Sequence, residues 1–143
     1  MKPVSFFVAG LPKPQGSKRA FMPPNARHPV VVESAGEPLK DWRASVSHAA
    51  QEQAVHFAGP VAVLLAFTFP RPKGHFGTGR NSEVLKASAP VRHTKKPDID
   101  KLSRAVLDAL THIVFADDSA VIELQASKEY GVPGCQITVE ART

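Results

Sequence analysis

Acidic residues gather in one stretch of an otherwise basic chain. Asp98 and Asp100 stand two residues apart in the sequence KKPDID at 95–100, and Asp117 and Asp118 follow after a predicted helix. Together with Asp108 they are five of the thirteen acidic residues, in a protein whose formal net charge is +5. Such a concentration of like charge costs free energy unless cations compensate it. The pattern therefore favours a site for a hard divalent cation.

Phosphodiester hydrolysis is a reaction that these carboxylates suit. It needs a Lewis acid on the phosphoryl oxygens and an activated water, and Mg²⁺ supplies both while a few carboxylates hold it and several waters stay bound. Asp98 and Asp100 lie at a loop-to-helix junction, and Asp118 enters a predicted strand. If that strand lies beside the helix start, the sequence predicts Asp98, Asp100 and Asp118 as metal ligands.

Each carboxylate also has a structural interpretation. Asp98 or Asp100 can cap the predicted helix or stabilise its first turn through the helix dipole. Asp117 and Asp118 can form the turn that precedes a strand. Spacing alone leaves both interpretations open.

Hydrophobic periodicity predicts the elements that position these residues. Residues 99–113 carry an i, i+3, i+4, i+7 apolar stripe and residues 38–55 carry a similar one, so both predict amphipathic helices. Strands are predicted at the ends of the chain and in its middle. They cover residues 4–9, 61–69, 121–127 and 136–141, with 61–69 a central strand covered on both faces and the last two a C-terminal hairpin. The order β-α-β-α-β-β predicts one small α+β domain with two main helices packed on a sheet.

Two long segments, at about 11–38 and 70–97, are rich in proline, glycine and basic residues and predict loops, the first with a short strand at 30–32. The pI of 9.6 favours a polyanionic partner. The basic loops suit binding to a phosphate backbone, with a solvated surface as the alternative. The predicted DNA contacts are Lys18, Arg19, Lys73, Arg80, Lys95 and Lys96 in the loops, and Lys101 and Lys128 near the acidic cluster.

Other signals exclude some partners and compartments. The single cysteine, Cys135, cannot form an internal disulfide, which fits a reducing cytoplasm. No run approaches the roughly 20 apolar residues of a membrane helix, so no membrane partner is predicted. The glycines at 74–79 lack the strand-loop-helix setting of a phosphate-binding loop, so no nucleotide cofactor is predicted. His75 and His93 are isolated loop histidines and stay outside the predicted catalytic set.

Several of these motifs, taken in order, resemble the RusA family of Holliday junction resolvases. The family pattern runs approximately K-P-D-x-D-N-L-x-K, then D-A-L, then D-D-x-Q-[VI], with a lysine at the far end of the following strand. This chain has KPDIDKL at 96–102, DAL at 108–110, DDSAV at 117–121 and then Lys128. The first strand and the proline-rich segment with Lys18 and Arg19 are also similar, so the resemblance extends over a single RusA-like domain at 1–143.

The resemblance implies a mixed sheet and a homodimeric endonuclease that uses Mg²⁺, or Mn²⁺ as a substitute, to nick four-way DNA junctions symmetrically in recombination and repair. Such enzymes are often carried by phages and prophages, which implies the cytoplasm of a bacterial host. The resemblance also implies that Asp98 and Asp100 are the paired acidic ligands and that Asp118 is the third essential carboxylate.

The chain departs from the family pattern at three positions. The asparagine after the second aspartate is Lys101, the glutamine after Asp-Asp-x is Ala120, and the catalytic lysine is Arg104. Arginine keeps the charge and binds phosphate bidentately, but it is a poorer proton donor than lysine. Arg104 is predicted to act on the scissile phosphate, with an ion pair along the helix as the alternative. Lys101 or Lys128 are candidate substitutes for the family's lysine.

These departures keep other functions open. A nuclease for flaps or forks has the same residues, and a junction-binding protein that has lost cleavage would explain Lys101 and Arg104. Metal-dependent nicking separates the enzymes from the binding protein. A structural or protein-interaction domain would have no affinity for junctions, which a salt titration of binding detects.

Overall fold

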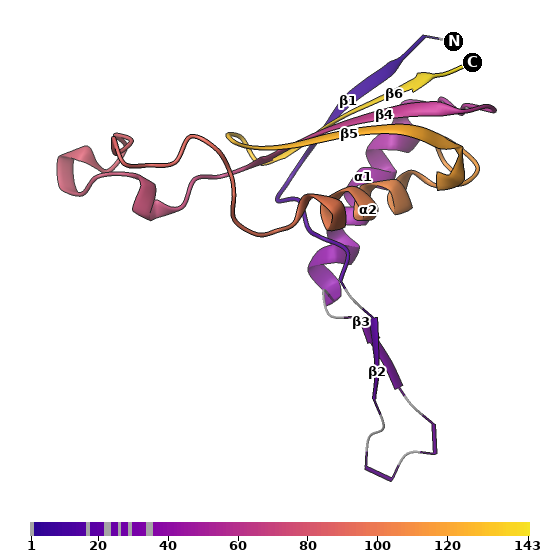
Figure 1. The fold of residues 1–143 in the computed structure, drawn as a ribbon, viewed down its shortest axis with the longest axis horizontal. Helices are drawn as coiled ribbons and strands as arrows, with labels where there is room; N and C mark the ends of the chain where they lie inside the picture. Colours follow the sequence, from indigo (N-terminus) through magenta and orange to yellow (C-terminus); the bar gives the residue numbers. More distant parts are fainter. Residues whose placement is uncertain (1, 17, 22–23, 26, 29, 34–35) are drawn as a thin grey trace.

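A four-stranded sheet carries both helices on one of its faces (Figure 1). The computed structural model describes residues 2–16, 18–21, 24–25, 27–28, 30–33 and 36–143, and only the backbone of 18–21 and 30–33. The sheet has the strand order β1-β6-β4-β5, and β4 pairs parallel with β5 and antiparallel with β6. The elements are β1 (Val4–Ala9), α1 (Gly36–Glu52), β4 (Val61–Phe69), α2 (Ile99–Leu110), β5 (Val121–Tyr130) and β6 (Gly134–Ala141). The predicted α+β class, with a mixed sheet and two helices, is confirmed.

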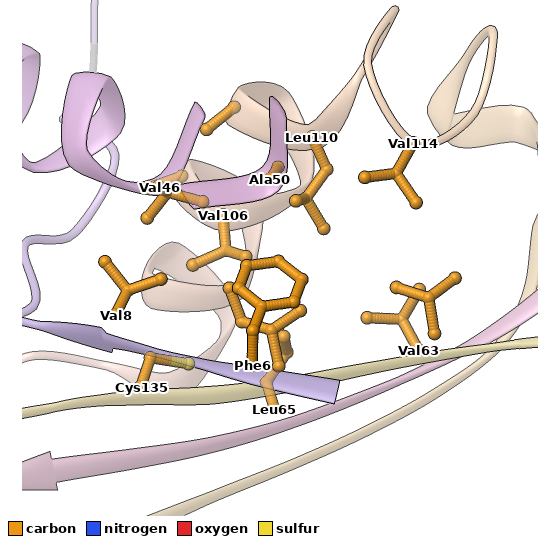
Figure 2. Packing of buried hydrophobic residues seen from close by; sticks show 14 of the residues in the cluster. Phe6, Val8, Val46, Ala50, Val63, Leu65, Val106, Leu110, Val114 and Cys135 are labelled. Carbon is orange, nitrogen blue, oxygen red and sulfur yellow. The ribbon is translucent and has the colours of Figure 1, made fainter. Parts of the chain in front are cut away.

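The core lies between the sheet and the two helices. Figure 2 shows Val46 and Ala50 of α1 and Val106 and Leu110 of α2 packed above the sheet. The alternation of apolar and polar residues in β1 and β6 produces this arrangement, because successive side chains of a strand point to opposite faces. The sheet contributes Phe6, Val8, Val63, Leu65 and Cys135 from below.

The central strand β4 is apolar along its whole length, as predicted. Its residues that face the helices, such as Val63 and Phe67, are fully buried. On the opposite face Leu64, Ala66 and Thr68 are only half-buried. The prediction of a strand covered on both faces is therefore wrong for the second face, because α1 and α2 both pack against the first (Figure 1).

The predicted C-terminal hairpin is wrong, although both of its strands exist. β4 lies between β5 and β6, and the turn after β5 passes the end of β4, where Gly131 N–H donates to the Phe69 carbonyl at 2.9 Å. Alternation in a sequence shows which face a residue occupies and says nothing about which strand is its neighbour. The most apolar strand, β4, is best buried with a neighbouring strand on each side. β5 can lie at the edge of the sheet, because its side chains are exposed or half-buried.

The two predicted loops contain more local structure than the sequence indicated. The first holds an antiparallel hairpin of β2 (Lys18–Phe21) and β3 (Val30–Glu33), and α1 already begins at Gly36. The second, which we call the arm (residues 70–97), holds two 3-10 turns, η1 (Lys73–His75) and η2 (Gly79–Asn81), and a bridge between Phe76 and Leu85. Hairpin and arm project from the sheet and helices in different directions (Figure 1). No helix in the described ranges has the length and apolar character needed to cross a bilayer.

The burial of Cys135 leads to a testable prediction about thiol reactivity. The side chain is fully buried in β6, and burial raises the pKa of the thiol to about 12. Because the thiolate is the nucleophile, the folded protein should react with a disulfide reagent at pH 8 far more slowly than the protein in denaturant. Measuring both rates by absorbance tests this. A native rate close to that of the denatured chain would show that the core around Cys135 opens readily.

Candidate functional site

The beginning of α2 positions two of the predicted ligands. Asp98 is the N-cap residue, and its carbonyl accepts a hydrogen bond from Leu102 N–H at 3.1 Å. Its side chain makes no capping hydrogen bond, and Asp100 occupies the first turn. Asp98 and Asp100 thus occupy the N-cap and first-turn positions that the structural interpretation gave them, but the exposed Asp98 carboxylate makes no capping hydrogen bond.

A hollow of about 370 Å³ lies between α2 and β5. Its polar lining residues include Asp100 and Arg104 from one side of α2, and Asp118 from the 3-10 turn η3 (Asp118–Ala120) that leads into β5. The remaining lining residues are Ile99, Ser103, Leu107, Leu124 and Ala126. The turn η3 begins eight residues after the end of α2, and β5 then packs along the helix. The fold therefore places Asp100, Arg104 and Asp118 on the lining of one hollow.

Asp98 lies elsewhere. It lines a second hollow, of about 490 Å³, with Lys96, Pro97 and Lys101 and the segment 14–16. Asp98 precedes the helix with extended backbone, at φ −74° and ψ 141°, whereas Asp100 lies in the first helical turn, and the two residues line different hollows. Over the part of the chain that the structure describes, no three His, Cys, Asp or Glu side chains form a group that could hold a metal ion. The three predicted ligands thus do not converge here, and two of them share a hollow.

Lys101 lies beside the carboxylate of Asp100. Its Nζ lies 3.5 Å from a carboxylate oxygen of Asp100, which is 68% exposed. Desolvation by itself raises the pKa of Asp100, but the charge of Lys101 and the hydrogen bonds around the carboxylate outweigh it, and the pKa lies below its ordinary value. Lys101 was predicted to contact DNA, and the structure places it half-buried beside this carboxylate.

Asp118 lies among like charges. A hydrogen bond between the carboxyl groups of Asp117 and Asp118 raises the pKa of Asp118. Desolvation and the charges of Asp117 and Asp108 raise it further. The same bond, with another from Ser119, lowers the pKa of Asp117. Carboxylates packed in this way are an environment that a divalent cation stabilises. The two carboxylates that line the hollow, Asp100 and Asp118, are also oxygen donors of the kind that Mg²⁺ takes. Mg²⁺ keeps several of its waters in protein sites and needs few protein ligands.

Arg104 has no competing partner in the described part of the chain. Its side chain is exposed, and neither Asp100 nor Asp108 forms an ion pair with it. The alternative interpretation, an ion pair along the helix, is therefore not what the structure shows. The guanidinium remains available to an anion that enters the hollow.

The other predicted DNA contacts belong to the arm, the hairpin and β5. Lys73, Arg80, Lys95 and Lys96 are exposed along the arm. The side chains of Lys18 and Arg19 lie outside the described residues, although their backbone forms β2. Lys128 is half-buried on β5, and its ammonium donates to two backbone carbonyls of the arm.

The sequence did not predict a cluster of side chains at the base of the arm. The Arg71 guanidinium lies 4.4 Å from the centroid of the Tyr130 ring, His93 stacks on that ring at 4.9 Å, and His75 meets its edge at 5.2 Å. His93 also contacts Phe69 of β4 at 4.8 Å. The two loop histidines thus help to hold the arm. Nothing in their sequence surroundings predicted this, because Tyr130 comes more than thirty residues later.

Comparison with known proteins places the chain in a family. The sequence model described as Endodeoxyribonuclease RusA matches residues 13–140. An uncharacterized protein of Bacillus subtilis (strain 168), YqaN, is 29% identical over 127 residues, which are 89% of this chain and 87% of that protein. The matched region includes α2, η3 and β5, the elements that build the hollow. The chain belongs to the RusA family of endodeoxyribonucleases.

Proposed function

We propose that this protein resolves four-way DNA junctions by metal-dependent hydrolysis of two symmetrically placed phosphodiester bonds. One observation carries the proposal. In a chain of an endodeoxyribonuclease family, Asp100, Arg104 and Asp118 line one hollow between α2 and β5. Two carboxylates and a free guanidinium are the groups that phosphodiester hydrolysis needs, a metal-binding pair and a cation for the phosphate.

Each residue of the hollow has a separate task. Asp100 and Asp118 would hold Mg²⁺, or Mn²⁺ in its place, while Asp98 lines the second hollow at the helix start. The chemistry that the bound metal supplies is polarisation of the phosphoryl oxygens and activation of a water. Lys101 lies 3.5 Å from Asp100 and helps to lower the pKa of that carboxyl group, so Asp100 stays ionised to a lower pH than an isolated aspartate. Arg104 binds the phosphate through its planar fork of N–H donors and stabilises the charge that develops on it.

The basic residues outside the hollow would hold the DNA backbone. The arm extends well beyond the sheet (Figure 1), and its exposed lysines and arginines suit contacts with the duplex arms of a junction. Binding that depends on such contacts weakens steeply as salt rises. Two symmetric cuts require two active sites, so the proposal includes a homodimer with two-fold symmetry. A role in recombination and repair, in the bacterial cytoplasm and in a phage or prophage setting, belongs to the same proposal.

The test is cleavage of a labelled synthetic four-way junction, a linear duplex of matched sequence and a flap, with and without Mg²⁺. We expect nicks in the junction, abolished by EDTA, and little or no cutting of the duplex. Preferential cutting of the flap would indicate another structure-selective nuclease. Tight junction binding without nicking in Mg²⁺ or Mn²⁺ would contradict the assignment as an enzyme and would indicate a junction-binding protein.

A further inference from the structure

We infer that Lys128 is a positioning residue, which holds the segment entering α2 and so fixes the acidic residues at the start of that helix. Lys128 lies on β5, more than twenty residues after the helix start in sequence but next to it in space. The inference rests on the proposed function, because it assigns Lys128 a part in that reaction. It departs from the sequence-based prediction that Lys128 contacts DNA.

The contacts of the ammonium group support this role. Lys128 Nζ donates to the Lys95 carbonyl at 2.6 Å and to the Pro97 carbonyl at 2.9 Å. Hydrogen bonds from a charged donor are shorter and stronger than neutral ones. The two acceptors flank Lys96. Pro97 directly precedes Asp98, the N-cap residue of α2. Two of the three donor hydrogens of the half-buried ammonium are thus used within the protein.

The next residue on the same face of β5 holds the base of the arm. The guanidinium of Arg71 and the ring of His93 both pack against the ring of Tyr130. Arg71 Nη1 also donates to the Pro90 carbonyl at 2.7 Å. The chain that runs from the arm into α2 is therefore fixed at Pro90, at His93 and then at the two carbonyls that Lys128 binds. Lys128 makes the last of these attachments before the acidic residues.

Small displacements at this point have large consequences for catalysis. A shift of about 1 Å in a catalytic group can lower a rate by about 10²-fold. Without the Lys128 ammonium, the carbonyls of Lys95 and Pro97 lose their donors and the segment before Asp98 is free to move. The loss should therefore appear in turnover and in the Mg²⁺ concentration needed for half-maximal activity, rather than in affinity for the junction.

The variants Lys128→Met and Lys128→Arg test the inference, with Lys40→Met as the matched control. Lys40 is 72% exposed on α1 and pairs with the exposed Glu37 at 3.4 Å, so its replacement removes the same charge far from the hollows and from the arm. At saturating junction we expect Lys128→Met to cleave about 10- to 100-fold more slowly and to need more Mg²⁺, with junction affinity in EDTA within about twofold of wild type. Lys128→Arg should recover part of the rate, because a guanidinium also donates to two carbonyls.

Three results would overturn the inference. They are wild-type turnover in Lys128→Met, a loss of junction affinity with unchanged turnover, and equal rates for Lys128→Met and Lys128→Arg. Hydrogen exchange gives a readout that does not depend on cleavage. The amide of Leu102, which bonds to the Asp98 carbonyl, should exchange faster in Lys128→Met than in Lys40→Met. A wild-type protein that fails to cut junctions would contradict the proposed function, while unchanged exchange would contradict the role of Lys128.

Discussion

Replacing Asp118 by asparagine is expected to lower junction cleavage by about 10³-fold or more, because one of the two carboxylates in the hollow is lost. The same substitution should not destabilise the fold. Asp118 is exposed, and the hydrogen bond with the Asp117 carboxyl group, desolvation and the neighbouring negative charges raise its pKa, so the folded protein disfavours its ionised form. Removing the charge at neutral pH therefore relieves repulsion when no metal is bound. The expected signature is lost activity with an unchanged or slightly raised Tm.

Cleavage rates in Mg²⁺ check the expected loss of activity, and thermal unfolding in EDTA checks the expected stability. The matched control is Asp41→Asn, an exposed carboxylate on α1 that should change neither quantity. If Asp118→Asn cut junctions within about threefold of wild type, the hollow between α2 and β5 would not be the site of hydrolysis. A large fall in Tm would show instead that Asp118 has a structural role in the turn before β5.

Removing the guanidinium of Arg104 is the second change with a large expected effect. Arg104→Ala should lower turnover by about 10²- to 10³-fold, the loss measured when one preorganised donor to a reacting anion is removed. Junction affinity should change little, because one phosphate contact among many is lost. Stability should also be retained, since Arg104 is exposed without an ion pair in the described part of the chain and alanine favours helices.

Arg104→Lys separates charge from geometry at this position. The RusA pattern has lysine there, so the variant should keep at least the wild-type rate, and a faster rate would show that a proton donor improves the reaction. Single-turnover cleavage measures both variants, with Arg43→Ala on α1 as the control. An Arg104→Ala variant with wild-type turnover would show that the chain performs its reaction without this cation, and Lys101 would become the next residue to test.

Periodicity predicted the helices and strands well but not how the strands neighbour one another. The stripe of Leu102, Val106 and Leu110 predicted α2 because those residues are the ones that pack into the core. The pairing of β5 with β4 was missed, since it depends on a crossover through the arm and α2 that no local signal records. The helix was predicted a few residues too long, because Ile113 continues the apolar pattern after the helix has ended at Leu110.

The candidate site was predicted in its chemistry and only partly in its geometry. Asp100, Arg104 and Asp118 line one hollow, because β5 packs along α2. The end of β5 that lies next to the helix start is the one that carries Lys128, and not its beginning after Asp118. Asp98 lines another hollow at the helix start, because it precedes the helix with extended backbone while Asp100 belongs to the first turn. The contacts of Lys128 join segments over thirty residues apart, and only the folded chain reveals them.

A supercoiled plasmid that extrudes a cruciform gives the most direct measurement of the proposed activity. Two symmetric cuts within one binding event convert it to a linear molecule, whereas a single cut releases the supercoiling and leaves a nicked circle. We predict linear product in Mg²⁺, with both ends mapping to the cruciform, and no product with Asp118→Asn. Nicked circles alone, or intact plasmid under conditions in which the protein binds the cruciform, would contradict the assignment of this protein as a junction resolvase.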